Sequence, residues 1–375
     1  MTIHASDLPG PLPPGFAELP HTIYRDDPCW IPEDPRRVAA MLGPDNPWFE
    51  QGRAAAFCVP GVCRASVSRA EGFAVDGAPS ACFGHWDTTG DPAAEDLVMS
   101  EVEGWARDAG AERLFGPINL STANDYRVRL DPANGAIPYI GEPYNPASYA
   151  DGLTRLGFRL VREFFGETWE REDLTELRDR TRPLTDKLVA AGYRFEPLDA
   201  RTWVEHSAEL VDVVNAIFDQ NFAFTRFSRE AFERQFDEAW ASTLAPEASL
   251  LVWGPDGDIA AVALVYPDYA PLVVQGAGPE RVPLGELSYA RHAPLLETLG
   301  PRTLVFKTGG TSPRHRRVGL GGAGVGIVAE RLLDTGTVRM LGGPMREDNP
   351  GFQVFGGGER KAHRYGLYTR ELRGS

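Results

Sequence analysis

Four glycines near the C-terminal end of the chain, Gly319, Gly321, Gly322 and Gly324, stand where a ligand could approach the backbone closely. They open a segment whose apolar residues recur at helical spacing. A helix N-terminus carries about half a positive charge and up to four unpaired N–H donors, which suit a diphosphate. The basic run R-H-R-R, 314–317, comes directly before. In a chain with 53 acidic and 38 basic residues, such a run favours a local anion site over a solvated basic loop.

Two ligand classes use such a turn. Residues 319–324 spell G-x-G-x-x-G, the dinucleotide fingerprint, which requires a strand directly before it and an acidic residue about 20 positions later. Here the strand-like run Thr303–Lys307 ends some ten residues too early, and the next one, 337–341, is followed by glycine and proline. The dinucleotide interpretation is therefore weak.

The spacing Pro313-x-x-Arg316-x-x-Gly319-x-Gly321 resembles motif A of the GNAT superfamily of acyltransferases, in the order strand, loop, helix. The resemblance implies that loop amides bind the pyrophosphate of coenzyme A while the pantetheine arm lies along a strand that splays from its neighbour. The cofactor, acetyl-CoA or another acyl-CoA, would then contact residues of this strand and loop: Phe306, Lys307, Thr308, Arg314, Arg316, Arg317, Val318, Gly319, Leu320, Gly321 and Gly322.

Such enzymes transfer the acyl group by direct attack of an amine on the thioester, so the protein must position both substrates and polarise the carbonyl. The tyrosine that often protonates the leaving thiolate in this family is not evident here. Asp268, His315, Glu347 and Asp348 are candidate bases, each also explicable as a solvated or structural residue.

The segment M-R-E-D-N-P, 345–350, stands where the family's order places the acceptor. We therefore expect Arg346, Glu347 and Asn349 to act on the acceptor side of the active site. The alternative is a capped turn in which Asn349 caps a helix that Pro350 begins.

The elements that must position these residues occur twice. Strand-like runs at 54–59 and 63–69 flank Pro60-Gly61, a run at 81–86 follows, and Asp91-Pro92 predicts the start of a helix reaching about Ala109. This order resembles a second GNAT-like domain. At its motif A position, Asp87 and Asp91 would satisfy the helix dipole themselves and repel a diphosphate.

The expected fold is α/β (α+β): two GNAT-like domains in tandem, each a mixed, mostly antiparallel sheet flanked by helices. We place a degenerate domain without a cofactor motif at 1–170, a charged linker at 171–183, and the domain with the acyl-CoA site at 184–375. In the second half, helices are expected at 203–218, from a Ser228 cap to about Trp240 and at 287–299. Strands are expected at 250–253 and 259–266 and near 365–370.

Length and composition narrow the function further. At 375 residues and 42% hydrophobic composition, the chain supports two cores. Its four cysteines lack C-x-x-C spacing, so neither a metal site nor a disulfide framework is expected. No run approaches the roughly 18 apolar residues of a membrane span, and the N-terminus lacks a signal pattern, which predicts a cytoplasmic protein.

A net charge of −15 makes nucleic acid an unexpected partner. The resemblance implies a small-molecule amine as the acceptor. Two alternatives stay open. Fem-type enzymes, which take an aminoacyl group from tRNA, also carry two GNAT-like domains, although tRNA binding favours a basic stripe. The other alternative is a CoA-binding or scaffold protein without turnover.

Overall fold

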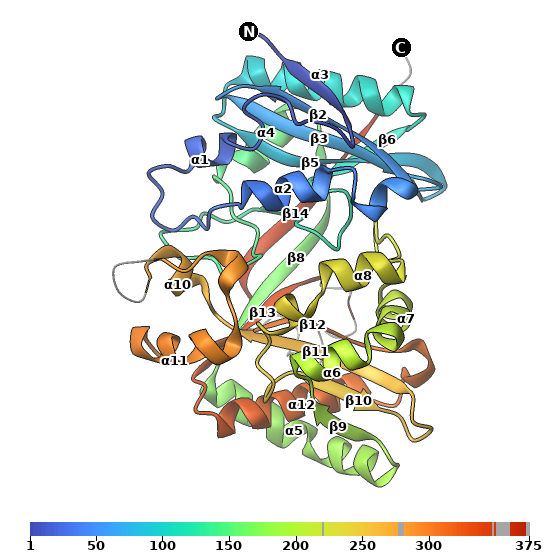
Figure 1. Ribbon diagram of the computed structural model, residues 1–375, viewed down its shortest axis with the longest axis vertical. Coiled ribbons are helices and arrows are strands. Elements are labelled where there is room, and N and C mark those ends of the chain that lie inside the picture. The colour runs from blue at the N-terminus through green and yellow to red at the C-terminus, as the bar shows by residue number, and fades with distance from the viewer. Residues whose placement is uncertain (220, 277–280, 347–348, 350–360, 373–375) are drawn as a thin grey trace. The chain divides into compact units, whose positions relative to one another are not determined.

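The structure, a computed structural model, describes residues 1–219, 221–276, 281–346, 349 and 361–372. The chain forms two compact units. Unit 1 comprises Met1–Glu163, Phe222–Thr225 and the segment from Arg364 onward; unit 2 comprises Phe164–Asn221 and Arg226–His363. Figure 1 shows the chain from the blue N-terminus to the red C-terminus.

Unit 1 contains these elements in chain order: β1 His4–Leu8, α1 Leu19–Ile23, α2 Pro35–Leu42, η1 Pro47–Glu50, β2 Gly52–Val59, β3 Cys63–Ala70, β4 Ala74–Val75, β5 Ala78–Thr88, α3 Pro92–Asp108, β6 Arg113–Gly116, β7 Val128–Arg129, α4 Ser148–Arg155 and the start of β8 Arg159–Glu170. Its sheet has the order β1-β2-β3-β5-β6, antiparallel except for the parallel pair β5–β6. The C-terminal strand β14, Lys361–Glu371, pairs with β6.

Unit 2 contains the rest of β8 and then α5 Arg171–Ala190, β9 Arg194–Pro197, α6 Ala200–Glu205, α7 Ser207–Phe218, α8 Arg229–Gln235, α9 Glu238–Ala241, β10 Leu250–Trp253, β11 Ile259–Pro267, α10 Ala270–Val274, η2 Leu284–Glu286, α11 Tyr289–Leu299, β12 Thr303–Thr311, η3 Pro313–His315, α12 Leu320–Asp334 and β13 Arg339–Arg346. Its sheet has the order β9-β10-β11-β12-β13-β8, and only β12 and β13 are parallel. The two units therefore repeat one pattern.

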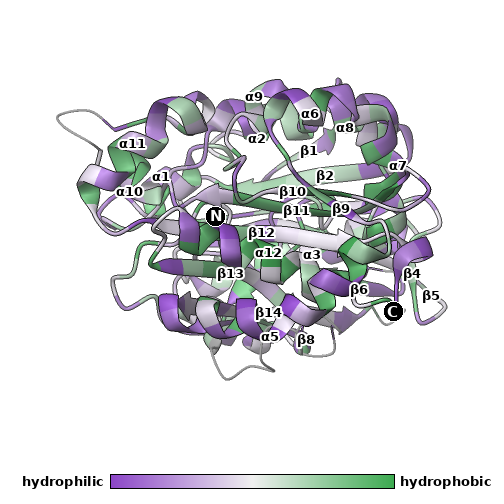
Figure 2. Cartoon of the chain, turned by 90° about the horizontal axis from the view of Figure 1, so that it is seen from below, coloured by the Kyte–Doolittle hydropathy of each residue, from purple (hydrophilic) through white to green (hydrophobic). Residues whose placement is uncertain are grey.

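The strands of unit 2 alternate their apolar side chains between two helical layers. On β10, Leu250 and Val252 join a core with α5 and α12, while Leu251 joins a core with α6 to α9. Figure 2 shows the consequence: β11, buried on both faces, is green, whereas the outer surface of α5 is largely purple. β12 pairs with the buried β11 along nearly its whole length and with β13 over its first four residues.

Local sequence signals explain most element boundaries. Asp91 caps α3 by accepting hydrogen bonds from Ala93 and Ala94 N–H, and Ser228 caps α8 through Ala231 N–H, as predicted. The helix expected at 203–218 is interrupted at His206, which separates α6 from α7. The helix that begins after Ser228 ends at Gln235 instead of Trp240.

Three predictions about the C-terminal half need correction. The run expected to stop at Lys307 continues as β12 to Thr311, because Gly309 and Gly310 pair with β11. The expected turn at 342–344 is part of β13 and carries a bulge. The segment 171–183, predicted as a linker, lies within α5 and packs against α12.

Candidate functional site

The first feature of the site is the point where β12 and β13 part. Their parallel pairing ends at Phe306 and Gly342. Beyond it, β12 pairs with β11 and β13 pairs with β8. A Cβ on Gly343 would lie 2.7 Å from the Lys307 carbonyl oxygen, so the strands are still in close contact just past the last pair. The ladder thus ends where the resemblance predicts that the strands part, although the backbones remain close at Lys307.

Lys307 is also the extra residue of a β-bulge. In the β11–β12 ladder, Val265 pairs with Phe306 and Leu264 pairs with Thr308, which leaves Lys307 between two pairs. A bulge rotates the backbone of the extra residue out of the regular ladder. The Lys307 side chain is exposed, as a strand lysine beside solvent would be.

The second feature is the loop from Ser312 to Gly319, between the end of β12 and α12. Arg317 has φ 69° and Gly319 has φ 88°, both in the left-handed region. The six backbone N–H groups from Arg317 to Gly322 donate to no acceptor within the part of the chain that the structure describes. Open N–H donors at the start of a helix, here the 15-residue α12, are the arrangement that binds anions in other proteins.

The glycines of this loop serve two different purposes. At Gly319, a Cβ would lie 2.8 Å from Leu184 Cδ1, so packing as well as φ requires glycine. At Gly321, a Cβ would meet only Thr311 Oγ1, at 3.9 Å, and at Gly324 it would meet nothing within 4 Å. The space beside Gly321 and Gly324, at the start of α12, is therefore open.

The basic residues of the loop divide into anchors and exposed charges. Arg316 donates from Nη2 to the Ile217 carbonyl oxygen at 3.2 Å and from Nε to the Thr311 carbonyl oxygen at 3.4 Å. It thereby holds the C-terminal turn of α7 beside the loop. Arg314 pairs with Asp258 at 3.1 Å but stays largely exposed, and Arg317 is exposed too. Arg314 and Arg317 are the cations available to a ligand phosphate.

The structure brings the predicted cofactor residues into one strand–loop–helix unit. Phe306 is half-buried against the α5–α12 core, and Thr308 follows the bulge. Val318 is exposed at the loop's tip, whereas Leu320 is buried and fixes the start of α12. Of the expected acceptor-side residues, Arg346 ends β13 opposite Phe164, and the Asn349 N–H donates to the Arg346 carbonyl oxygen at 3.0 Å. Glu347 and Asp348 lie outside the described residues.

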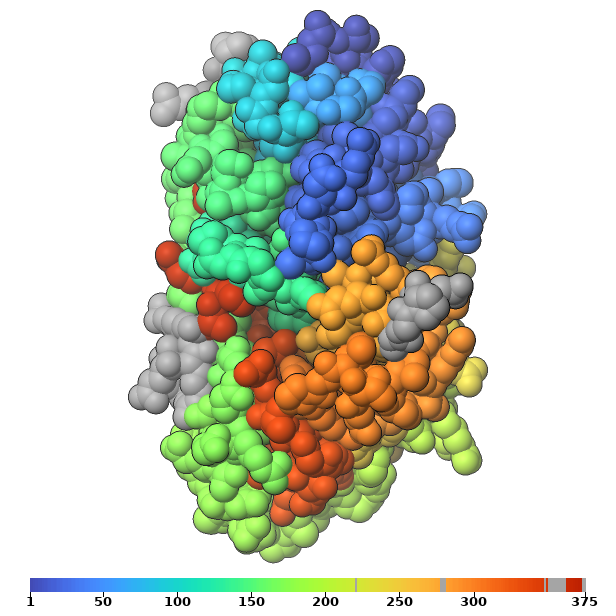
Figure 3. Space-filling view, turned by 90° about the vertical axis from the view of Figure 1, so that its left-hand side faces the viewer, coloured from blue at the N-terminus to red at the C-terminus, as the bar shows by residue number. Residues whose placement is uncertain are grey.

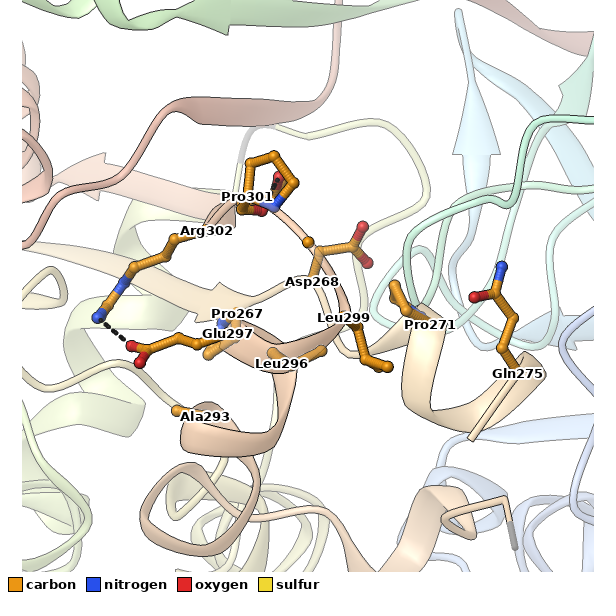
Figure 4. Close-up of a pocket in the computed structure, with 12 residues that line it drawn as sticks. Pro267, Asp268, Pro271, Gln275, Ala293, Leu296, Glu297, Leu299, Pro301 and Arg302 are labelled. Carbon is orange, nitrogen blue, oxygen red and sulfur yellow. Dashed lines mark hydrogen bonds and ion pairs between the residues drawn. The ribbon is translucent and has the colours of Figure 1, made fainter. Parts of the chain in front are cut away.

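Two of the candidate bases have defined surroundings. His315 is buried, with both ring nitrogens engaged by Tyr193 and Asp258. Asp268 lines a cavity of about 270 Å³ at the start of β12, the end opposite the glycine loop. Figure 4 shows its carboxylate in the cavity wall, apart from the ion pair between Glu297 and Arg302. The largely exposed helix α11 is among the orange atoms in Figure 3.

In unit 1, the turn between β5 and α3 stands where unit 2 has the loop between β12 and α12, but its N–H groups are hydrogen-bonded. Three residues separate β5 from α3, where eight separate β12 from α12. The donors at the α3 N-terminus are satisfied: Asp91 accepts from Ala93 and Ala94 N–H, and Thr88 Oγ1 accepts from Gly90 N–H. Such a turn offers no set of open amides comparable to residues 317–322.

Asp87 differs from its predicted position. It lies within β5, not at the helix N-terminus, and pairs with the buried Arg64 at 2.7 Å. Arg64 also pairs with Glu33 and donates to the Phe16 carbonyl oxygen, both at 2.8 Å. Asp87 therefore compensates a buried cation instead of capping α3.

The described ranges hold neither a metal-binding cluster nor a membrane-spanning helix. Within them, no three His, Cys, Asp or Glu residues are grouped so that they could hold a metal ion. None of the helices described has the length and apolar character needed to cross a membrane.

Comparisons with known proteins support the fold. No protein-family model matches the sequence. A curated relative, the protein YghO of Escherichia coli (strain K12), is 23% identical over 235 residues, and the match spans 60% of this chain and 58% of that protein. The chain thus matches less than two thirds of that relative's length.

Among solved structures, a tandem GNAT protein from the clavulanic acid biosynthesis pathway aligns with 99% of this chain and 100% of its own, with a TM-score of 0.52 and 14% identity. A GCN5-related glucosamine N-acetyltransferase region of a fungal β-N-acetylglucosaminidase aligns with 98% of this chain and 38% of its own, with a TM-score of 0.53 and 11% identity. At these identities the likeness concerns the fold, and the predicted tandem α/β arrangement is confirmed.

Proposed function

We propose that this chain, which has the tandem GNAT fold, is an N-acyltransferase that binds acetyl-CoA or another acyl-CoA in unit 2 and acylates a small-molecule amine. The observation that carries the proposal is the set of six open N–H groups at Arg317–Gly322, beside the open space at the start of α12. A diphosphate supplies the acceptor oxygens that these donors need. The end of the β12–β13 pairing at Phe306 provides a place for an extended thioester arm beside β12.

The chemistry asked of the chain is positioning and polarisation. The amine nitrogen attacks the thioester carbonyl carbon, the C–N bond forms, and the C–S bond breaks to release a thiolate. The amine loses one proton and the thiolate gains one. We assign the part of β12 beyond Phe306 to holding the thioester, where positioning and polarisation of the carbonyl are needed.

Ligand-dependent stabilisation tests the donor class. CoA, acetyl-CoA, longer acyl-CoAs, NADH and NADPH should be compared by thermal shift with the intact chain. A ligand that binds only the folded state at 100 times its Kd stabilises it by about 2.7 kcal/mol. We expect a shift with CoA or its thioesters and none with NADH or NADPH. A shift with the nicotinamide cofactors alone would contradict the proposal.

Gly321→Asp tests the location of the site. The structure has room for the new Cβ, so the fold should persist, while the carboxylate would face the diphosphate. We expect CoA affinity to fall at least about a hundredfold, or about 2.7 kcal/mol. Gly321→Ala separates shape from charge and should weaken binding less. Gly104→Asp, on an open face of α3, controls for placing a carboxylate in a helix. Wild-type CoA affinity in Gly321→Asp would place the site elsewhere.

Arg346 and Asn349 are proposed to contact the acceptor. Arg346 ends the strand that parts from β12, and the Asn349 N–H is bonded to its carbonyl oxygen. Arg346→Ala should reduce kcat/KM for the acceptor about tenfold, or about 1.4 kcal/mol, with CoA affinity unchanged. Glu347→Gln is predicted from the sequence to behave alike. If turnover of both variants equals wild type with an identified acceptor, this segment is a capped turn.

A further inference from the structure

His315 has surroundings unlike those of its neighbours in the loop. Arg314, Arg316, Arg317 and Val318 are exposed, whereas His315 is 8% exposed. Its Nδ1 lies 3.0 Å from the Tyr193 hydroxyl, and its Nε2 lies 3.1 Å from Asp258 Oδ2. The His315 side chain therefore points into unit 2, whereas the side chains of Arg314, Arg317 and Val318 are exposed.

Two segments of unit 2 surround the imidazole of His315. Tyr193 follows α5 and contacts the ring edge-on, with the centroids 5.6 Å apart and the planes at 83°. Asp258 belongs to the turn between β10 and β11. In the same turn, a Cβ on Gly254 would lie 2.6 Å from His315 Cε1 and 2.7 Å from Asp258 Oδ1, so glycine leaves room for the hydrogen-bonded pair. The absence of a side chain at position 254 thus leaves space for the His315 ring.

The hydrogen bonds fix the orientation of the ring. The Asp258 carboxylate only accepts, so Nε2 of His315 carries a proton and donates to it. Nδ1 is hydrogen-bonded to the Tyr193 hydroxyl. This bond from His315 holds the pKa of Asp258 below its usual value, and the Arg314 charge adds to the effect. With both nitrogens engaged, the ring is poorly placed to act as the base suggested by the sequence.

We expect the loop to need such an anchor because its backbone conformation costs free energy. Arg317 is a non-glycine residue with positive φ, and six N–H groups converge without protein acceptors. The loop is fixed at its first residue by the bond from Ser312 N–H to the Ala260 carbonyl oxygen and at its end by buried Leu320. Between these points, His315 is the buried side chain.

We propose that His315 is a positioning residue that, through Tyr193 and Asp258, holds the loop 312–319 in the conformation that binds the diphosphate. This inference rests on the proposed function and adds the element that preorganises its site. Preorganisation acts on affinity, because the free loop no longer has to be ordered when the ligand binds. Loss of the anchor should therefore raise the Kd and KM for CoA and leave kcat nearly unchanged.

The test combines a measurement without ligand and one with ligand on the intact protein. His315→Gln removes the ring, and Tyr193→Phe removes only the hydroxyl. In the free protein we expect faster hydrogen exchange at the bonded amides of Ser312 and His315. With CoA, we expect a Kd about tenfold higher for His315→Gln and about threefold higher for Tyr193→Phe, with kcat within about twofold of wild type.

His292→Gln is the matched control. His292 is also buried in unit 2, but its Nδ1 accepts from Ser288 N–H at 3.1 Å within the α11 region. We expect this variant to lower stability without opening the loop or weakening CoA binding.

Four other results would each contradict one specific claim. Unchanged exchange at Ser312 and His315 in His315→Gln would overturn the anchoring role, whether or not CoA binds. Faster exchange with unchanged CoA affinity would show that the anchored conformation is not the binding one and overturn the inference. If His292→Gln changed loop exchange and CoA affinity as much as His315→Gln does, His315 would be a packing residue without a specific role in the loop. A wild-type protein that does not bind CoA would overturn the proposed function, and this inference with it.

Discussion

The buried His85 of unit 1 shows how a single residue can set the pH dependence of stability. Its Nδ1 lies 2.8 Å from Ser66 Oγ, and its Nε2 has no hydrogen-bond partner among the described residues. Burial, with the Arg64 charge acting in the same direction, lowers the pKa of His85 to about 3 from 6.5. Because the unfolded state then binds the proton more readily, stability is complete above pH 6.5 and falls as the pH drops toward 3.

This linkage gives a measurable prediction. Between pH 7.5 and pH 5.0, unit 1 should lose about 2 kcal/mol of unfolding free energy through His85. His85→Asn does not titrate and tolerates the positive φ of 46° at this position. Native-state hydrogen exchange at β3 and β5 amides should show the loss in wild type and a loss smaller by that amount in the variant. Equal losses in both proteins would contradict the assignment.

At the scale of residues, the sequence predicted the glycine loop as a candidate anion site, but it did not predict the residues that contact His315. Arg316, Gly319 and Gly321 follow a local spacing that can be recognised without a structure. Asp258 and Tyr193 stand 57 and 122 residues before His315, and no local pattern joins them. Their role depends on tertiary contacts, which single-sequence patterns do not carry.

At the scale of elements, the close packing of α5 against α12 fixes the direction of the proposed anion site. A Cβ on Gly326 would lie 1.9 Å from Thr181 Oγ1, so the two helices meet at a glycine. Thr181 Oγ1 in turn donates to the Leu177 carbonyl oxygen at 2.8 Å and cannot swing away without losing this bond. The contact is therefore a constraint on the position of α12.

Two glycine substitutions on α12 distinguish the effect of the α5–α12 contact on stability from the effect of helix propensity. Gly326→Ala should destabilise unit 2 by about 1–3 kcal/mol, because overpacking moves α12 against α5. Gly324→Ala has open space around its new methyl group and should be neutral or stabilise by up to about 1 kcal/mol. Thermal unfolding of the two variants measures both effects. Similar melting temperatures would mean that the helices adjust without cost.

The elements themselves were largely predictable, and the misses have physical causes. Alternating or continuous apolar runs identified β2, β3, β10 and β11, and caps identified α3 and α8. The far half of β12 was missed because T-G-G-T resembles a loop; its strand conformation comes from pairing with β11. The bulged end of β13 was missed for the same reason, since glycine and proline usually mark turns.

At the scale of the whole molecule, the segments that complete each sheet come from distant parts of the chain. Residues 164–170 of β8 pair with β13 in unit 2, and β14 pairs with β6 in unit 1. The sequence indicated tandem folds but placed the boundaries at 170 and 184, so that 364–372 went to the second domain. Periodicity identifies a strand but gives no information on the strand it pairs with. The pairing of β8 with unit 2 and of β14 with unit 1 was therefore not predictable.

This assignment makes a direct prediction about fragments. Fragment 184–375 lacks the β8 residues that pair with β13, and it lacks Leu174 and Leu177, which are buried against α12. Fragment 164–363 retains every segment of unit 2. We expect 164–363 to melt cooperatively and to show the CoA-dependent shift of the intact chain, and 184–375 to give no cooperative transition, because an exposed β13 edge and an uncovered α12 leave too little apolar burial. Calorimetry of both fragments, with and without CoA, measures this. A cooperative melt of 184–375 would mean that β8 and the first half of α5 are dispensable, and that the boundary drawn from the sequence is the one along which unit 2 folds.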